Sequence, residues 1–410
     1  MQEKTVWVVG HKNPDTDSIC AAIAYAYLKN ATEEGTVFVP KRAGNINNET
    51  RYVLQRFDVK EPEMISYVGA QIKDIDYRHT DGVSGHYSLK KAWELMRKLD
   101  VVTLPVVDVN KRLEGVIVNG DIAYSYMDIL DNRILGQAKT QYRNIIETIQ
   151  GTMVTGNYHA HFTKGKVVVA SGNRETLREE VEDDDLVITG NIKERQLIAI
   201  EQNASCVIVC GKTKVDPEVV EEAKKKECVL ITTNYDSFTT ARLIHQSMPI
   251  RHFMTKENII TFEPDDYVDD VKETMSKIRH RDFPILDEQR RLVGMMSRRH
   301  LLNMKKKQLI LVDHNEKTQA VDGIDQADIL EIIDHHRLGS LETITPIFFR
   351  NQPLGCTATI IYQMYEEKGI EINEQIAGLL CAAIISDTLM FRSPTCTAVD
   401  KAVAEKLAAI

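Results

Sequence analysis

The sequence lacks several features that mark whole classes of protein. Its seven cysteines form no C-x-x-C pair, and most lie in apolar runs such as ASCVIVC, which predicts buried free thiols in a reducing cytoplasm. Cys206 and Cys210 are spaced C-x3-C, but no second ligand pair lies nearby, which argues against structural zinc. No apolar run approaches the ~18 residues of a membrane span, and the N-terminus MQEKTVWVVG lacks the basic and apolar regions of a signal peptide. We therefore expect a cytoplasmic protein with no membrane partner.

An excess of positive charge is also missing. The formal net charge is −9 and the pI is about 5.8. Proteins that bind nucleic acids or membrane surfaces concentrate positive charge, so no nucleic-acid partner is expected. A local basic pocket for a phosphate ligand remains compatible with this balance. The 410 residues, of which 43% are hydrophobic, are enough for two to four domains with buried cores.

The two ends of the chain share a pattern of alternating predicted strands and helices. An apolar strand is predicted over residues 6–9, followed by a polar loop and a helix over 18–30, with Asp17 or Ser18 as its N-cap. After Lys307, QLILVDHN and ILEIIDHH are predicted to be buried strands that end in acidic and histidine residues, and two helices are predicted to follow over about 355–368 and 373–386. Such alternation of strands and helices is typical of a parallel α/β sheet.

An internal repeat lies between these two ends. The segments LPVVDVNKRLEGVIVNGDI and FPILDEQRRLVGMMSRRHL follow the same strand–turn–strand–helix plan. This predicts a pseudo-symmetric pair of small domains at 66–130 and 248–306. The segment 131–247 has its own strands and helices and is predicted to be a separate small domain. The simplest architecture is one α/β domain, made of 1–65 plus 307–410, that this long insertion interrupts.

Four junctions place polar side chains at the ends of apolar runs. They are GHKNPDTDS, LVDHNE, IIDHHR and IISDTL, and each is interpreted as the end of a strand. The carboxyl ends of parallel strands lie along one edge of a sheet, where ligands bind. The residues predicted to converge at that edge are His11, Asp15, Asp17, Asp313, His335 and Asp387.

This set of residues predicts a metal site. A single Asp after a strand is usually a cap or turn residue, and Asp17 or Asp387 alone would need no further explanation. Four such junctions, however, would gather like charges at a cost unless a cation binds them. Carboxylates and imidazoles without thiolates suit manganese, cobalt or magnesium. Two such ions ~3.5–4 Å apart can share a carboxylate and activate a water for attack at phosphorus, so we predict a two-metal phosphohydrolase.

At these residues the sequence resembles the DHH phosphoesterase superfamily, named for the triad that stands here as Asp334-His335-His336. Within it, GHKNPDTDSICAAIAYAYLK, LVDHNE, IIDHHR, PLGCTATIIYQMY and AAIISDTLMFRSPTCT are similar to the family II, manganese-dependent inorganic pyrophosphatases. The resemblance covers about 1–65 and 307–410. It implies a parallel-sheet DHH catalytic domain and hydrolysis of pyrophosphate to two phosphates.

The same resemblance implies roles for individual residues. One manganese or cobalt ion would be held by His11, Asp15 and Asp313. The second would be held by Asp17, His335 and Asp387 together with Asp313, which would be the catalytic bridge. His336 would be the second catalytic residue and contact a phosphate of the substrate. A magnesium ion often enters such sites with the substrate, and a hydroxide bridging the metals would attack one phosphorus.

The repeated units resemble CBS domains, which pair to bind adenine nucleotides. Their ribose-binding pattern is incomplete in both copies. In GVIVNGD, Asp121 matches but a valine takes the Ser/Thr place, and in GMMSRRH, Ser297 matches but His300 takes the Asp place. Arg298 and Arg299 are candidate phosphate partners, with a solvated helix start as the alternative. The middle segment, with VITGNIKERQLIAIE, is similar to the DRTGG domain of some such pyrophosphatases, which implies regulation by adenine nucleotides.

One feature of the family is not matched. Family II pyrophosphatases carry a second catalytic domain whose Lys and Arg residues, including a Ser-Arg-Lys-Lys-Gln motif, clamp the substrate. The sequence ends at KAVAEKLAAI, where the linker to that domain would begin. Because electrostatic clamping of the transferring group is a major catalytic contribution, we expect a truncated chain with weak or no turnover.

Two other interpretations stay open at this point. The chain could be another DHH phosphoesterase, which would act on oligonucleotides, cyclic dinucleotides or polyphosphate. The sequence motif NPDTDS, however, favours a pyrophosphatase. A non-catalytic nucleotide sensor would keep a vestigial site, against which the intact set of metal ligands argues. CBS pairs and this enzyme family commonly form dimers, so the resemblance also implies a homodimer.

Overall fold

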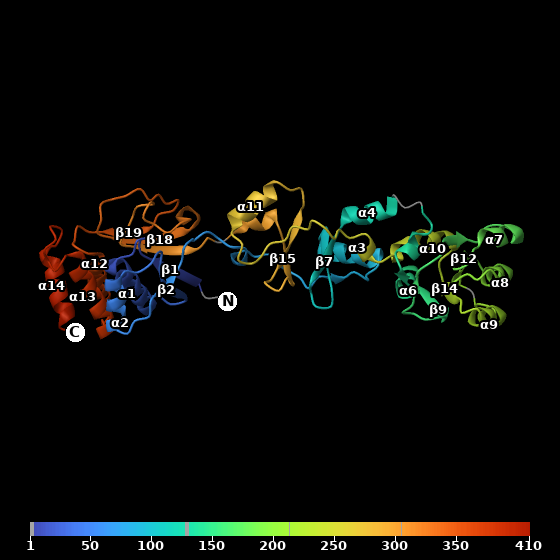
Figure 1. Cartoon of the computed structure of the whole chain (residues 1–410), viewed down its shortest axis with the longest axis horizontal. Helices are drawn as coiled ribbons and strands as arrows, with labels where there is room; N and C mark the ends of the chain where they lie inside the picture. The colour runs from blue at the N-terminus through green and yellow to red at the C-terminus, as the bar shows by residue number, and fades with distance from the viewer. Residues whose placement is uncertain (1–3, 128–130, 213, 305) are drawn as a thin grey trace. The chain divides into compact units, whose positions relative to one another are not determined.

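The computed structural model describes residues 4–127, 131–212, 214–304 and 306–410. The chain forms two compact units (Figure 1). Unit 1 comprises Met1–Asp76, Asp265–Arg279 and Arg299–Ile410, and unit 2 comprises Tyr77–Pro264 and His280–Arg298. The expected boundary between 66–130 and 131–247 involves residues 128–130, which lie outside the described residues, as do residues 1–3 of the first segment.

Unit 1 is built on a sheet with the strand order β19-β18-β17-β1-β2-β3. Every pairing in it is parallel, which confirms the predicted α/β class with a parallel sheet. β1 pairs with β17, with Val8 opposite Ile310, so strands from the two ends of the sequence are neighbours. The strands are β1 (Lys4–Val9), β2 (Thr36–Arg42), β3 (Glu63–Met64), β17 (Gln308–Val312), β18 (Asp328–Asp334) and β19 (Phe348–Asn351).

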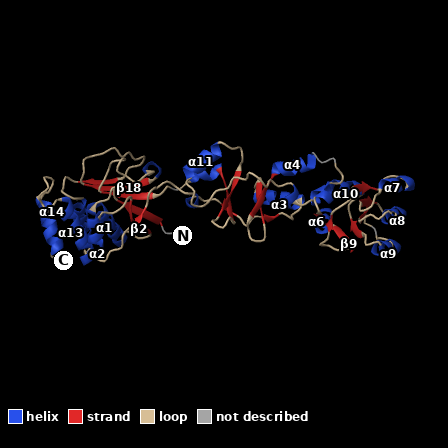
Figure 2. Cartoon of the chain, in the orientation of Figure 1, coloured by secondary structure: helices blue, strands red, loops and turns tan. Residues whose placement is uncertain are grey.

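Helices from both ends of the chain pack with this sheet, and Figure 2 shows several of them beside its strands. They are α1 (Thr16–Thr32), α2 (Asn48–Arg56), α12 (Thr357–Lys368), α13 (Glu374–Asp387) and α14 (Ala398–Ala408). Their apolar side chains form one core with Val6, Val8 and Ile310 of the strands. A second cluster, which includes Leu309 and Leu311, buries side chains that alternate with these along the strands, so both faces of the sheet are covered.

Two details of unit 1 differ from the expectation. The N-cap of α1 is Asp15, whose carboxylate accepts the backbone N–H of Ser18 at 2.9 Å, and the prediction of Asp17 or Ser18 as the cap is wrong. Asp17 lies in the first turn of α1, and its carboxylate accepts the backbone N–H groups of Thr357 and Ala358. Asp387 is the last residue of helix α13, so the interpretation of IISDTL as the end of a strand is also wrong. A continuously apolar run fits a buried helix as well as a buried strand.

The two repeated segments form matching antiparallel hairpins. The first is β6 (Thr103–Val107) with β7 (Leu113–Val118), and the second is β15 (Asp282–Leu286) with β16 (Leu292–Ser297). Arg112 and Arg291 hold the same place in the two copies and pair with each other through an antiparallel bridge, so a pseudo-twofold axis passes between them. The flanking helices are α3 (Leu89–Leu99) and α4 (Asn119–Met127) in the first copy, and α11 (Val268–Ser276) and the 3-10 helix η4 (Arg298–Asn303) in the second.

The rest of unit 2 is a smaller α/β sheet with the order β11-β12-β13-β14-β9, of which only β9 is antiparallel to its neighbour. Helices α7, α8 and α9 bury one face and α6 and α10 the other. The core on the face that α6 and α10 cover also contains Leu89, Ala92 and Met96 of α3. The first repeat and the middle segment therefore share one core. The elements are β9 (Gly151–Thr155), β11 (Val167–Val169), β12 (Leu186–Thr189), β13 (Cys206–Cys210), β14 (Val229–Thr233), α6 (Tyr142–Ile149), α7 (Arg174–Glu180), α8 (Lys193–Glu201), α9 (Pro217–Lys225) and α10 (Ser237–Ile244).

Short elements connect these parts. They are β4 (Arg78–His79), β5 (Val83–Ser84), α5 (Ile134–Gln137), β8 (Thr140–Gln141) and β10 (His161–Phe162), with the 3-10 turns η1 (Ile72–Asp74), η2 (His245–Ser247), η3 (Ile250–His252) and η5 (Ile324–Gln326). All seven cysteines are free, and five of them are buried. Among the helices of the described residues, none combines the length and apolar character that crossing a membrane requires.

Candidate metal centre

The six predicted ligands come from three neighbouring strands and two helices of unit 1. The strands β1, β17 and β18 lie side by side, and their carboxyl ends lead into His11, Asp313 and His335 respectively. Asp15 is the N-cap of α1, the next element after β1, Asp17 lies in the first turn of α1, and Asp387 ends α13. The rule that carboxyl ends of parallel strands share one edge therefore accounts for the convergence of the three strand-end residues.

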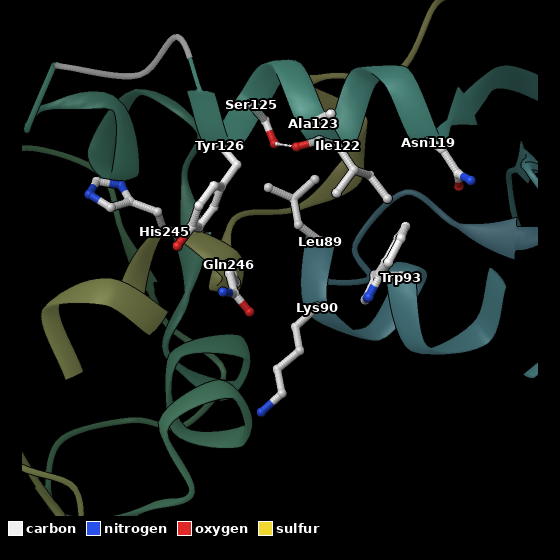
Figure 3. Close-up of a pocket in the computed structure, with 10 residues that line it drawn as sticks. All are labelled: Leu89, Lys90, Trp93, Asn119, Ile122, Ala123, Ser125, Tyr126, His245 and Gln246. Atoms are coloured by element: carbon white, nitrogen blue, oxygen red, sulfur yellow. Dashed lines mark hydrogen bonds between the residues drawn. The ribbon is translucent and has the colours of Figure 1, made fainter. Parts of the chain in front are cut away.

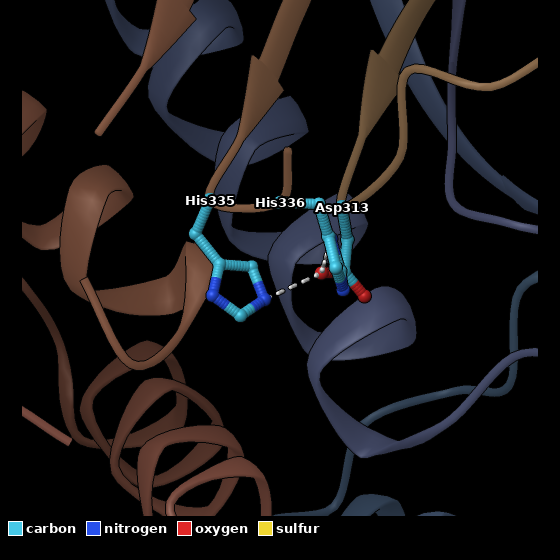
Figure 4. Close-up of side chains that lie close together, drawn as sticks. All are labelled: Asp313, His335 and His336. Carbon is cyan, nitrogen blue, oxygen red and sulfur yellow. Dashed lines mark ion pairs between the residues drawn. The ribbon is translucent and has the colours of Figure 1, made fainter. Parts of the chain in front are cut away.

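Asp313 lies between two histidines. Its Oδ2 is 3.3 Å from Nε2 of His11, and its Oδ1 is 3.6 Å from Nε2 of His335. Nε2 of His11 is also 3.6 Å from Asp15 Oδ2, and Nε2 of His335 is 3.4 Å from Asp387 Oδ2. Figure 4 shows the imidazole of His335 directed at the carboxylate of Asp313. One carboxylate with a separate histidine at each oxygen is the arrangement that a bridging ligand requires.

Asp17 completes the second half of the cluster. It is buried, and its carboxylate accepts the backbone N–H groups of Thr357 at 2.7 Å and Ala358 at 3.0 Å, at the start of α12. The positive end of a helix stabilises a carboxylate in this position. Three sets of side chains have ligand atoms within 4.8 Å of one another: His11, Asp15 and Asp313; Asp313, His335 and His336; and Asp17, Cys356 and Asp387.

Three carboxylates of this cluster, those of Asp17, Asp313 and Asp387, resist ionisation. For Asp15, burial opposes ionisation, but His11 and the backbone N–H of Ser18 lower its pKa. Burial and the charge of Asp15 raise the pKa of Asp17 to about 6, and burial and the charge of Asp17 raise the pKa of Asp387 to about 7. Burial and Asp17 raise the pKa of Asp313 well above its ordinary value. For His11, burial opposes protonation, but Asp15 and Asp313 raise its pKa to about 10. The cluster therefore requires positive charge, which a proton on His11 supplies only in part.

The donor atoms fit a divalent cation. Nδ1 of His335 donates its hydrogen to the carbonyl oxygen of Leu354 at 3.0 Å, which leaves the lone pair of Nε2 directed into the cluster. Nε2 of His335 and Oδ2 of Asp387 are buried and have no hydrogen-bond partner among the described residues. Asp313 adopts a left-handed backbone conformation with φ of 64°, which is uncommon for a residue with a side chain. Such strained positions are typical of functional sites.

His336 stands at the open side of the cluster, with 48% of its side chain exposed. Its Nδ1 is 2.8 Å from Oδ1 of the buried Asp334, and that ion pair raises the pKa of His336. The same oxygen of Asp334 accepts the backbone N–H groups of His335 and His336. Asp334 thus favours the protonated form of an imidazole that stands at the exposed side of the cluster.

Three residues at the centre were not among the predicted site residues. Asp334 orients His336, the hydroxyl of Thr357 donates to Asp313 Oδ1 at 3.1 Å, and the thiol of Cys356 lies beside Asp17 and Asp387. Burial and the charge of Asp17 raise the pKa of the Cys356 thiol well above its ordinary value, so the thiol stays protonated. Asp334 is part of the Asp-His-His triad and could have been predicted from the sequence. Cys356 and Thr357 lie in the segment GCTAT, and nothing in that segment indicates which strand the turn faces.

The residues predicted to bind nucleotide are spread over both units. In unit 2, Asp121 lies in the first turn of α4 and accepts the backbone N–H of Val118 at 2.9 Å. Ser297 ends β16 in the same unit, and the Arg298 guanidinium that follows it donates to the carbonyl oxygen of His280 at 2.8 Å. His300 lies in η4 and belongs to unit 1.

A mostly apolar cavity of about 510 Å³ lies beside the helix that carries Asp121. In Figure 3, Trp93 of α3 and Tyr126 of α4 line it together with Leu89 and Ile122. Trp93 is 42% exposed and Tyr126 is 49% exposed, so unit 2 carries large apolar side chains on its surface at this point.

Comparison with known proteins identifies the family. The model of the DHH family, N-terminal domain, matches residues 5–384. The cobalt-dependent inorganic pyrophosphatase of Clostridium perfringens is 44% identical over 99% of this chain and 74% of its own length. A probable manganese-dependent inorganic pyrophosphatase of Thermotoga maritima is 36% identical over 98% of this chain and 73% of its own. The chain therefore belongs to the DHH family and, within it, to the metal-dependent inorganic pyrophosphatases.

The regulatory part also has a solved counterpart. This is the crystal structure of the CBS and DRTGG domains of the regulatory region of Clostridium perfringens pyrophosphatase, complexed with the activator diadenosine tetraphosphate. It is 37% identical and covers 56% of this chain and 100% of that chain, with a TM-score of 0.54. The repeated units and the middle segment therefore have the fold of CBS and DRTGG domains.

Proposed function

We propose that this chain is a metal-dependent inorganic pyrophosphatase that hydrolyses pyrophosphate to two phosphates under the control of adenine nucleotides. The observation that carries this conclusion is the position of Asp313, with one carboxylate oxygen facing His11 and the other facing His335. Asp17 and Asp387, two carboxylates of the same cluster, have raised pKa values, and relatives that align over nearly the whole chain are manganese- or cobalt-dependent pyrophosphatases.

The ligands divide into two sets in this proposal. His11, Asp15 and Asp313 hold one manganese or cobalt ion, and Asp17, Asp313, His335 and Asp387 hold the other. When bound, the two ions supply a water nucleophile at neutral pH and neutralise charge that develops on the phosphoryl oxygens. Asp313 keeps the two positions together, and the amides of α12 and the carbonyl of Leu354 fix the orientation of Asp17 and His335.

His336 supplies a second catalytic group. Its imidazole, held by Asp334, presents a hydrogen-bond donor and a positive charge at the exposed side of the cluster. A pyrophosphate oxygen that binds there is oriented toward the metal ligands, and the donor stabilises the charge that builds up on that oxygen.

Regulation resides in the repeated units in this proposal. The counterpart from Clostridium perfringens binds diadenosine tetraphosphate as an activator, and Asp121, Ser297, Arg298 and His300 are proposed to contact an adenine nucleotide here. A nucleotide changes activity only to the extent that it binds two conformations unequally. The division into a DHH domain (1–65 plus 307–410), CBS domains (66–130 and 248–306) and a DRTGG domain (131–247) is part of the same proposal.

The proposal also includes the oligomeric state of the protein and its location in the cell. A homodimer is proposed because Trp93 and Tyr126 expose large apolar surfaces on α3 and α4, and such patches mark interaction sites. Sedimentation equilibrium should give twice the chain mass, and a monomer at micromolar concentration would contradict this. The protein is proposed to act in the cytoplasm, where its seven free thiols stay reduced, and to bind no nucleic acid.

The substitution Asp313→Asn tests the function. It should abolish tight binding of both manganese ions and lower the rate of phosphate release from pyrophosphate by roughly 10²-fold or more, because each ion contributes several kcal/mol to transition-state stabilisation. Asp58→Asn, which alters an exposed carboxylate of the same unit, is the matched control and should change neither quantity. Unchanged metal content in Asp313→Asn, or phosphate release from short oligonucleotides in place of pyrophosphate, would contradict the proposal.

A further inference from the structure

Unit 2 contains a second cavity, of about 460 Å³, with a strongly basic lining. Six basic side chains line it: His86, Lys139, His161, Arg251, His252 and Lys256. We call it the basic cavity. It shares no lining residue with the apolar cavity of Figure 3 and contains none of the residues proposed to bind nucleotide at the repeats. Its volume lies within the range of ligand pockets, roughly 300–1,000 Å³.

Three segments that are distant in sequence form the walls of the basic cavity. The loop before α3 is joined to η3, because the backbone N–H of Arg251 donates to the carbonyl oxygen of Gly85 at 3.0 Å. Asn144 of α6 donates its side-chain amide to the carbonyl oxygen of His86 at 2.9 Å. His161 is placed by the pairing of β10 with β8, opposite Gln141. Hydrogen bonds therefore hold the backbone at Arg251, His86 and His161 before a ligand binds, and the six basic side chains are exposed to solvent at the cavity.

The positive charges of the basic cavity are poorly neutralised by the protein. Glu114 pairs with Arg251 at 3.4 Å, and the ion pairs found among the described residues include none for Lys139 or Lys256. A guanidinium nitrogen of Arg251 lies 3.5 Å from Nε2 of His86. Burial and the charges of Arg251 and His161 lower the pKa of His86, so the basic groups already repel one another. In a chain with a net charge of −9, such a local concentration of positive charge needs an explanation.

We propose that the basic cavity binds a condensed phosphate chain of three or more phosphates, either as inorganic polyphosphate or as the phosphate chain of a nucleotide. One or two cationic side chains are enough to bind a single phosphate group. The basic cavity has three permanent cations and three imidazoles, a number of donors that suits an anion with several phosphate groups. The cavity is concave, and the net negative charge of the chain disfavours a long nucleic acid. All of its lining residues belong to unit 2 and none of them is a predicted metal ligand, so it is a site in addition to the catalytic one.

Direct titration of the metal-free full-length chain with tripolyphosphate tests this proposal. Removing divalent ions with a chelator leaves the metal centre an acidic cluster that repels the ligand. The double variant Arg251→Gln/Lys256→Gln should raise the Kd for tripolyphosphate at least about tenfold, since each charge-assisted hydrogen bond is worth roughly 1.5–3 kcal/mol. The control Lys224→Gln/Lys225→Gln, which removes two exposed charges from α9 of the same unit, should change it by less than about twofold.

Lysine acetylation of the unaltered protein gives an independent measurement that does not depend on how the variants fold. Tripolyphosphate should protect Lys139 and Lys256 from acetylation and leave Lys224 unprotected. Protection by both tripolyphosphate and ATP assigns the site to the phosphate chain alone, and protection by ATP only assigns it to the phosphate chain of a nucleotide. Protection by neither ligand, or equal affinity of the double variant and its control, would overturn the proposal.

Discussion

At the scale of single residues, Asp313 determines the character of the metal centre. It is almost fully buried, its backbone is left-handed, and each of its carboxylate oxygens faces a different histidine. Burial and the left-handed backbone raise the energy of the metal-free state, because a buried carboxylate without a cation is costly, and the protonated His11 offsets this cost only in part. Binding of cations therefore removes a cost already present in the folded chain.

The pH dependence of stability in the metal-free chain should report this cost. The pKa of Asp387 is about 7 in the folded chain and ~3.9 in an unfolded chain. Between these two pH values Asp387 is protonated in the folded chain and ionised in the unfolded chain. The contribution of Asp387 to the free energy of unfolding is therefore fully present at low pH and is lost as pH rises toward 7. Urea unfolding of the metal-free protein should show stability that falls between about pH 4 and pH 7.

The substitution Asp387→Asn removes one of the titrating carboxylates and should make this fall shallower, while Asp17 and Asp313, whose pKa values are also raised, still contribute to it; Asp58→Asn should leave the fall as in the parent chain. Added manganese should remove most of the loss at pH 7 by competing with the proton. Identical pH profiles for Asp387→Asn and the parent chain would show that this carboxylate does not carry the effect.

At the scale of elements, the start of α12 supports the site. Its first amides bind Asp17, and the turn before it is fixed by Asp400 of α14. The buried carboxylate of Asp400 accepts the backbone N–H of Gly355 at 2.9 Å and the hydroxyl of Thr359 at 2.7 Å. α14 thus positions a metal ligand through α12 without touching the centre itself.

Replacing Asp400 should therefore affect both stability and metal binding. Asp400→Asn replaces a buried carboxylate that accepts several hydrogen bonds and should lower the free energy of unfolding by about 2 kcal/mol. Metal affinity should fall roughly 10–100-fold, as when other outer partners of metal ligands are lost. Chemical denaturation and isothermal titration with manganese measure the two effects, with exposed Asp325→Asn as the control. A loss of stability with unchanged metal affinity would disprove the link to Asp17.

At the same scale, the accuracy of prediction from sequence differed between elements for physical reasons. The strands β1, β17 and β18 were predictable because their apolar runs are short and rich in Val and Ile, the features that distinguish a buried strand from a buried helix. The helix that precedes Asp387 was also predictable, over about 373–386, but Asp387 itself was interpreted as the end of a strand, whereas it is the last residue of α13. The pairing of Asp334 with His336 was also beyond the sequence, since it depends on the turn that follows β18. The basic cavity could not be predicted because its three segments are far apart in the chain.

At the scale of the whole molecule, the first repeat and the middle segment share one hydrophobic core. Side chains of α3, β6 and β7 pack in the same cluster as those of α6, β12 and β13. A perturbation of the middle segment should therefore reach the first repeat through packing, with no ligand required.

The substitution Ile145→Ala tests this coupling. Ile145 lies in α6 and is fully buried, so its truncation should cost about 2–5 kcal/mol. Hydrogen exchange should accelerate in β6 and β7 of the first repeat together with β12 and β13. Ile192→Ala, at a side chain that is 47% exposed, is the matched control and should change exchange little. Faster exchange confined to β12 and β13 would show that the two parts unfold independently.

The pairing of β1 with β17 also has a consequence for biosynthesis. Val6 lies opposite Gln308, so the first strand must wait for roughly 300 further residues to leave the ribosome before its partner exists. At synthesis rates of about 5–20 residues per second this delay lasts on the order of 15–60 s. Most of unit 2, which runs from Tyr77 to Pro264 without interruption, is synthesised within that interval. The regulatory part can therefore fold first, while β1 and α1 remain exposed to chaperones until β17 is made.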